Sequence, residues 1–212
     1  SNLQKLERLY LDRTSVTDEG ISDLVDLSAL TTLSLNETKI TDKCLSTIAG
    51  LGSLQTLNLA DTTITDDGLA CLAEMESLQL LSLDGTSISG AGLMHLTSLV
   101  QLKTLSLRRI QLTADLSTQL ENLTGLEHLD LRETNLQVVD VAQLQKQLPN
   151  LVIGLSPSSE NSRNAFQRYL AGETLRGPVS RTDPLPEAAA PSPGRKVVDA
   201  VSQITEGGNV PD

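Results

Sequence analysis

Aromatic residues are almost absent from this chain of 212 residues, which contains no Trp, one Phe and two Tyr. Aromatic side chains normally supply much of the buried area of a core or a binding site. The hydrophobic 39% of the sequence is therefore aliphatic and mainly Leu, which predicts a regular, layered core. No apolar run reaches the length that spans a bilayer, so we expect no membrane partner.

Positive charge and cysteine are also scarce. The net charge is −11 and the pI about 4.6, so we expect no nucleic-acid partner, because an acidic surface repels backbone phosphates. Cys44 and Cys71 form no CxxC pair. We predict that both are reduced thiols in the cytoplasm, which is a reducing compartment.

Leucine recurs with an invariant period of 24 residues through six copies, each of which reads LxxLxL. The first leucines of the copies are Leu6, Leu30, Leu54, Leu78, Leu102 and Leu126. In a strand, the alternation LxL places both leucines on one face. The apolar spacing of three in the half that follows suits a short helix. Such a period predicts a solenoid, in which each unit buries its leucines only against its neighbours.

The second half of the repeat also follows a recurring sequence pattern, as in TSVTDEGISDL (14–24), TKITDKCLSTI (38–48) and TTITDDGLACL (62–72). We expect the Thr of each Thr-Asp pair to cap a helix and the Asp to lie in the first turn, near the positive end of the helix dipole. These pairs are Thr17-Asp18, Thr41-Asp42 and Thr65-Asp66. Small residues are expected where backbones approach closely, at Gly20, Cys44, Gly68 and Gly92.

A threonine also recurs where each strand should end. Its hydroxyl group can bond the backbone of an adjacent turn, which is worth about 1 kcal/mol per bond. The residues are Thr14, Thr38, Thr62, Thr86 and Thr134.

Complete repeats, such as LTTLSLNETKITDKCLSTIAGL and LQTLNLADTTITDDGLACLAEM, resemble the leucine-rich repeat family. Their TxITDxGLxxL half is similar to the ribonuclease-inhibitor-like and F-box-associated repeats and to similar bacterial repeats. The resemblance covers residues 3–153. It implies a right-handed α/β solenoid, or horseshoe, with a concave parallel β-sheet and short convex helices.

Three segments are expected along the chain. Residues 1–154 form the solenoid, as six repeats and a terminal strand, and we expect the natural protein to continue upstream because nothing before Leu3 resembles a cap. Residues 155–176 are expected to form a short helix, from Ser159 to Gly172, that covers the last repeat. Residues 177–212 are rich in Pro and are expected to be disordered.

Catalytic residue patterns are not found in the sequence. Ser and Thr occur without a paired base or an oxyanion motif. His95 and His128 have no Cys or second His at metal-ligand spacing. We therefore predict that the protein is not an enzyme and has no cofactor or metal.

The outward-facing side chains of the predicted strands are the remaining candidates for a site. In the middle repeats they are small and polar, which makes a poor binding hot spot. Cations gather at the end of the array, partly balanced by Asp130 and Glu133, and a smaller group lies at its start. The candidate partner-binding residues are Arg108, Arg109, His128, Asp130 and Arg132 at the end, and Arg8 and Tyr10, with Arg13 beside them, at the start.

The sequence thus predicts a monomeric, non-catalytic module that binds a protein partner through the concave face. This rests on the resemblance and on the arginine cluster, since fold alone does not give function. One alternative is the substrate-receptor part of an F-box-type ubiquitin ligase, with a docking module upstream. The other is a structural spacer within a larger protein, which the bland centre of the concave face favours.

Overall fold

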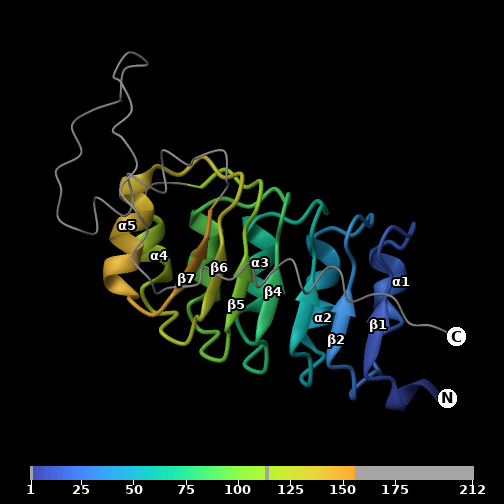
Figure 1. Cartoon of the computed structure of the whole chain (residues 1–212). Coiled ribbons are helices and arrows are strands. Elements are labelled where there is room, and N and C mark those ends of the chain that lie inside the picture. Colours follow the sequence, from blue (N-terminus) through green and yellow to red (C-terminus); the bar gives the residue numbers. More distant parts are fainter. Residues whose placement is uncertain (1, 113–114, 156–212) are drawn as a thin grey trace, which may run out of the picture.

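The computed structural model describes residues 2–112 and 115–155. Seven parallel strands form one open sheet in chain order, and helices cover one side of it (Figure 1). The strands are β1 (Arg8–Tyr10), β2 (Thr32–Ser34), β3 (Thr56–Asn58), β4 (Leu80–Ser82), β5 (Thr104–Ser106), β6 (His128–Asp130) and β7 (Val152–Gly154). Each residue pairs with the residue 24 positions later, as Leu9 does with Leu33. The α/β solenoid predicted from the period is confirmed.

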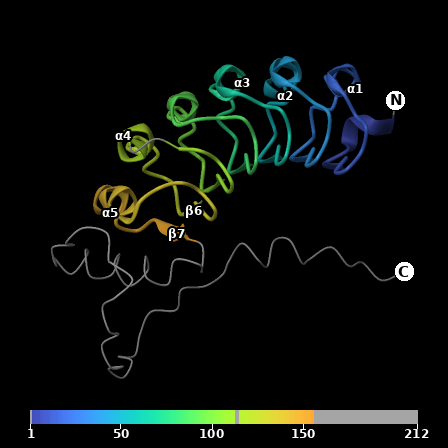
Figure 2. The ribbon, with the colours of Figure 1, turned by 90° about the horizontal axis from the view of Figure 1, so that it is seen from above.

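The helices lie on the outer side of an arc, with the sheet on the inner side (Figure 2). The α-helices are α1 (Asp18–Ser22), α2 (Leu45–Ala49), α3 (Asp66–Leu72), α4 (Leu116–Leu120) and α5 (Val138–Gln147). The 3-10 helices are η1 (Asn2–Lys5), η2 (Asp42–Cys44) and η3 (Ala91–Leu96). The arc arises because each short strand is followed by a wider helical segment on the outer side. The helix expected over 159–172 and the tail lie outside the described residues.

The core is a stack of aliphatic layers, as the composition predicted. In the inner repeats the leucines of LxxLxL are fully buried; for example, Leu33, Leu57, Leu81 and Leu105 are each 0% exposed. The helices and strands of each unit pack on those of the neighbouring units, which is the expected behaviour of a solenoid.

The strand-exit threonines form the hydrogen bonds that their position suggested, but within their own turn. Thr38, Thr62 and Thr86 are buried, and each donates its hydroxyl to the carbonyl three residues earlier at 2.6–2.7 Å. The residue at this turn has a positive φ in all six repeats, from 53° to 61°, including Arg109, which precedes Ile110 rather than a threonine. Where a threonine is present, its hydroxyl bond closes this tight left-handed turn after the strand.

The predicted helix caps are wrong for Thr17 and Thr65, whose side chains form no capping bond. Only Thr41 accepts from its own helix, at 3.4 Å from the Lys43 amide. Thr41 and Thr65 both donate their hydroxyl groups to a carboxylate of the preceding repeat. Thr65 donates both its N–H and its hydroxyl to the Asp42 carboxylate, at 2.8 and 2.6 Å.

The same contact joins the first four repeats, and we call each one a carboxylate rung. The rungs are Asp18 with Thr41, Asp42 with Thr65 and Asp66 with Ser89. The expected close approach is confirmed at Gly68 and Gly92, where a Cβ would collide with the carboxylates of Asp42 and Asp66. A glycine therefore makes room for the rung.

Cys44 occupies the place that Gly68 and Gly92 hold in later repeats. Its side chain is buried, and its Sγ lies 3.3 Å from the Thr41 carbonyl. Burial, and after it the charge of Asp18, raises the pKa of the Cys44 thiol to about 12. The thiol is thus held in its neutral form, as a small apolar substitute should be.

Candidate protein-binding surface

The outward side chains of the strands line the concave face of the arc. The row nearest the start of the strands is Arg8, Thr32, Thr56, Leu80, Thr104 and His128. In the next row, Ser34 and Ser106 are buried because each hydroxyl donates to a carboxylate of the preceding repeat, Asp12 at 2.5 Å and Asp84 at 2.6 Å. The centre of the face is therefore small and polar, as predicted, and part of its hydrogen-bonding capacity is already used within the sheet.

The three arginines at the end of the array are each paired with a carboxylate. Arg109 Nη2 donates to both oxygens of Asp61 at 2.7 Å, across 48 residues of sequence. Arg108 Nη2 lies 3.4 Å from Glu133 Oε1.

Arg132 makes the most extensive of these pairings. It donates to the carboxylate of Asp130, with its Nε at 3.0 Å from both oxygens and its Nη2 at 2.6 Å from Oδ2. Asp130 is only 3% exposed, so removal of Arg132 would leave a buried carboxylate without its ion pair. The pairing expected with Asp130 and Glu133 is found.

These groups form one connected set of charges, which we call the arginine network: Arg108, Arg109, Arg132, Asp61, Asp84, Asp130 and Glu133. Burial raises the pKa of Asp84, although the hydroxyl of Ser106 and the backbone N–H of Arg108 bond its charged form. The hydrogen bond that Arg109 donates to Asp61 raises the pKa of Arg109, which stays cationic. With three arginines and four acids, the network is a mixed surface rather than the cationic patch that the sequence suggested.

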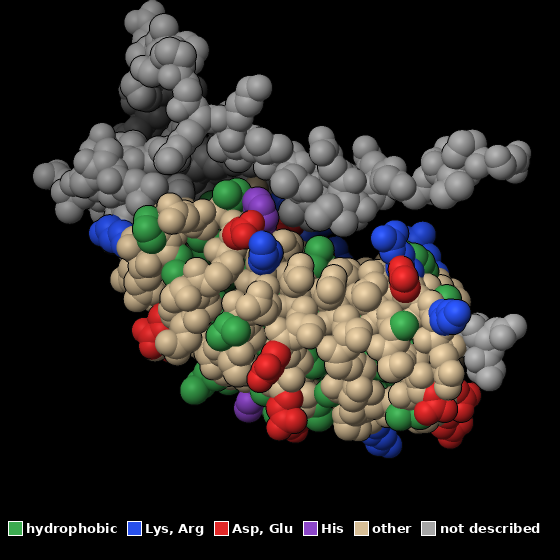
Figure 3. All heavy atoms as spheres, turned by 90° about the horizontal axis from the view of Figure 1, so that it is seen from below, with side chains coloured by type: hydrophobic (Ala, Val, Ile, Leu, Met, Phe, Trp, Pro, Cys, Tyr) green, Lys and Arg blue, Asp and Glu red, His purple; other side chains and the backbone are tan. Residues whose placement is uncertain are grey.

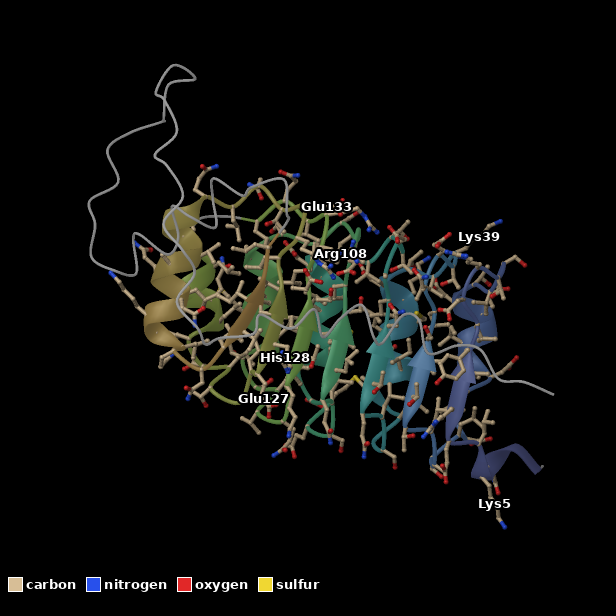
Figure 4. The ribbon with its side chains drawn as sticks, viewed as in Figure 1. Lys5, Lys39, Arg108, Glu127, His128 and Glu133 are labelled. Atoms are coloured by element: carbon tan, nitrogen blue, oxygen red, sulfur yellow. The ribbon has the colours of Figure 1, made fainter. Side chains whose placement is uncertain are left out.

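The predicted site residues do not all meet at one place. Figure 4 shows Arg108 and Glu133 near the ends of the strands, whereas His128 and Glu127 lie toward their starts. His128 therefore shares a strand with Asp130 but stands apart from the arginine network.

The smaller group lies at the other end of the sheet, on and after β1 (Figure 1). Tyr10 is 62% exposed, and Arg13 Nε pairs with Glu37 Oε1 at 3.0 Å. The structure thus keeps the two predicted groups of candidates separate.

Asp61 and Asp84 were missed as members of the site. Asp61 stands in the same row as Arg109, two repeats earlier, with Gly85 between them. A Cβ on Gly85 would collide with the Asp61 carboxylate and lie 3.1 Å from Arg109 Nη2, so the ion pair passes directly over this glycine. The signal was available in the sequence as opposite charges two periods apart with a glycine between them.

Apolar side chains offer no obvious alternative site on the face that Figure 3 shows, where they are scattered among polar and charged ones. Among the residues whose burial the structure describes, the large exposed hydrophobic ones are Tyr10, Val25, Met94, Val100 and Val152. Within residues 2–112 and 115–155, no group of three His, Cys, Asp or Glu side chains is arranged to hold a metal. No helix in these same ranges is long and apolar enough to cross a membrane.

The comparisons with known proteins agree with this architecture. A family model described as leucine rich repeat matches residues 28–88. The crystal structure of internalin C2 from Listeria monocytogenes is 30% identical, with a TM-score of 0.52, and the match covers 74% of this chain and 76% of that one. The chain belongs to the leucine-rich repeat family. Whether its repeats are of the ribonuclease-inhibitor-like or F-box-associated subtype stays a prediction.

Two further solved leucine-rich repeat structures are similar to it. An internalin, InlF, from Listeria monocytogenes is 26% identical with a TM-score of 0.57, and the match covers 72% of this chain and 48% of that one. A leucine-rich repeat protein from Leptospira interrogans is 24% identical with a TM-score of 0.58, covering 71% and 37% respectively, and shows the fold alone. The leucine-rich repeat chain thus spans less than half the length of these two proteins. No curated protein matches it.

Proposed function

We propose that this leucine-rich repeat chain is a non-catalytic protein-recognition module, and that its partner binds the concave face at the arginine network. Solenoids of this kind present an extended concave surface, which is their usual site of binding. The carboxylates hold the arginine side chains in place, and Arg is enriched at the residues that dominate protein interfaces. A guanidinium that is already fixed loses less conformational entropy when a partner binds.

The single observation that supports this proposal is that paired charged side chains stay accessible on a concave face whose centre is otherwise small and polar. Arg109 and Asp61 each keep 40% of their side-chain surface exposed, although they are bonded to each other. Glu133 is 54% exposed beside Arg108. A partner with both acidic and basic side chains fits this mixed surface, because each of its charges meets an opposite one.

A binding experiment tests the proposal with a matched control. The intact chain is used as bait, and the proteins it recovers are compared with those recovered by an Arg108→Ala/Arg109→Ala variant. Arg132 is left in place, because its removal would leave the buried Asp130 unpaired and destabilise the fold. Arg13→Ala is the control, since Arg13 has the same row, a similar φ and a carboxylate partner of its own.

We expect the double variant to lose partners that the parent and the Arg13→Ala chain both retain. Equal recovery by all three chains would reject the arginine network as the site. No reproducible partner for any of them would favour the alternative of a structural spacer, which the small, internally bonded centre of the concave face supports.

A ubiquitin-ligase substrate receptor requires a separate docking module, so sequencing the complete open reading frame tests that alternative. A cytoplasmic, monomeric protein is consistent with Cys44 and Cys71 being unbridged.

A further inference from the structure

The first repeat exposes apolar side chains whose equivalents in the second to fifth repeats are buried. Leu9 and Leu11 are only partly buried, whereas Leu33 and Leu35, one period later, are 0% exposed. Val16 is likewise partly buried at the position where Ile40 is fully covered in the next repeat. The end face of the solenoid at β1 therefore has the composition of an interior layer.

The outer edge of β1 has no neighbouring strand, since β1 ends the sheet. On its inner edge, Glu7 accepts bonds from the backbone of the second repeat and Leu11 donates to Ser34 at 2.8 Å. Alternate residues of a strand direct their backbone groups to opposite edges. The N–H and C=O groups of Arg8 and Tyr10 therefore face outward, at the edge of an otherwise paired sheet.

Thr17 shows which contact this face is built to make. It has the extended backbone of its equivalents, with φ −121° and ψ 176°, compared with −120° and 178° at Thr65. Thr41 and Thr65 each give two bonds to the carboxylate of the repeat before them. Within the described residues Thr17 is exposed and gives no such bonds. Its N–H and its hydroxyl are therefore two donors without a carboxylate acceptor in this part of the chain.

Gly20 is a second, independent sign of the same contact. At Gly68 and Gly92 a Cβ would collide with the rung carboxylate of the preceding repeat. Gly20 holds the equivalent position in the first repeat, but a Cβ there would meet only Val16, at 3.0 Å. The space that later glycines leave for a carboxylate is thus present at Gly20 as well.

We propose that this end face is an interface for one further leucine-rich repeat of the Thr-Asp type, stacked ahead of the first. Its strand pairs in parallel with β1, and its Asp accepts the N–H and hydroxyl of Thr17 as a fourth carboxylate rung. The proposal continues an interface already present six times in the sheet. It is independent of the binding site proposed on the concave face.

A second copy of this chain, stacked head to tail, does not provide the required acceptor. The residues at the Asp position in the last three repeats are Gly90, Ala114 and Val138. None of them has a carboxylate to receive the donors of Thr17. The occupant is therefore a repeat that resembles the first three of this chain rather than its last three.

The first arm of the test uses the 212-residue chain and measures the urea midpoint of unfolding. Thr41→Val removes the hydroxyl from an existing rung, so we expect the midpoint to fall. Thr17→Val removes the equivalent hydroxyl where no rung is formed, so we expect the midpoint to stay unchanged. An equal fall in both variants would show that Thr17 already has a structural role in the chain alone and would overturn the proposal.

The second arm places a copy of residues 49–72 directly before Ser1, which continues the period. We expect a higher midpoint and a steeper denaturant dependence, because the new unit buries the end face. Thr17→Val should now lower the midpoint, and so should the D66A change made in the copied segment alone. An extended chain with an unchanged midpoint, or one insensitive to both substitutions, would overturn the proposal.

Discussion

Removal of one carboxylate rung should destabilise the protein far more than removal of the carboxylate beside it. Asp66 accepts the Ser89 amide at 2.7 Å and the Ser89 hydroxyl at 2.6 Å, in a partly buried position. Hydrogen bonds to charged groups contribute about 1.5–3 kcal/mol each. Because the site is partly open to water, we expect Asp66→Ala to lower the free energy of unfolding by about 2–4 kcal/mol in total.

Asp67 provides the control within the same helical turn. It is exposed, it lies beside Asp66 at the start of α3, and it has the same charge. Asp67→Ala therefore removes the same interaction with the helix dipole but no rung, and should cost only about 0.3–1 kcal/mol. Urea unfolding of both variants at pH 7, followed by far-UV circular dichroism, measures the difference. Equal losses would show that Asp66 acts through its charge near the helix end and would refute the rung.

Three further predictions follow from the turns, the arginine network and the thiols. Gly85→Ala should cost about 1–2 kcal/mol, because φ is +61° and the new Cβ meets the ion pair above it, whereas Gly52→Ala, in open space, should be nearly neutral by the same urea assay. Burial raises the pKa of the Asp84 carboxyl in the folded state above its ordinary 3.8, so the folded state binds the proton more tightly than the unfolded state, and the free energy of unfolding falls as the pH rises from 3.8 through the folded-state pKa. Between acidic and neutral pH, Asp84→Asn should therefore lose less stability than the parent chain. An identical pH profile of unfolding for the two chains would contradict this. In native protein at pH 8 a thiol reagent should modify Cys71 but not Cys44, whose pKa of about 12 leaves it protonated, and two thiols should react in urea; rapid native modification of both would disprove the buried state of Cys44.

The fold could be predicted almost completely because its determinants repeat in the sequence. The LxxLxL period alone sets which residues pair, so Leu9 had to lie beside Leu33 and Leu33 beside Leu57. Parallel strands with buried leucines and outer helices then follow from packing one unit on the next.

The Asp residues of the Thr-Asp pairs lie in the first helical turn as predicted, but the capping role of Thr17 and Thr65 was predicted incorrectly. Capping rules consider a side chain and the helix directly after it, and Thr65 satisfies them in sequence. In the stack, however, Thr65 also lies beside Asp42, which is 23 residues away, and it donates its N–H and its hydroxyl to that carboxylate. The Thr65 side chain is therefore oriented by the neighbouring repeat and accepts no bond from its own helix.

The candidate site shows the same limit. Sequence reasoning identified Arg108, Arg109 and Arg132 and the nearby acids, but it treated each repeat with its direct neighbours. The bond from Arg109 to Asp61 spans two repeats, and it exists only because Gly85 leaves the row open between them. Which ion pairs form across a concave face depends on side-chain reach and intervening bulk, and the period does not specify either.

Hydrogen exchange of the intact chain, alone and with a partner recovered by the binding experiment, tests the central claim most directly. The claim is that the concave face at the arginine network recognises a protein, while the outer helices only support the arc. We predict slower exchange on binding in residues 104–109 and 128–133, and unchanged exchange in α4 (Leu116–Leu120). Slower exchange confined to the outer helices, with none at the ends of β5 and β6, would contradict it.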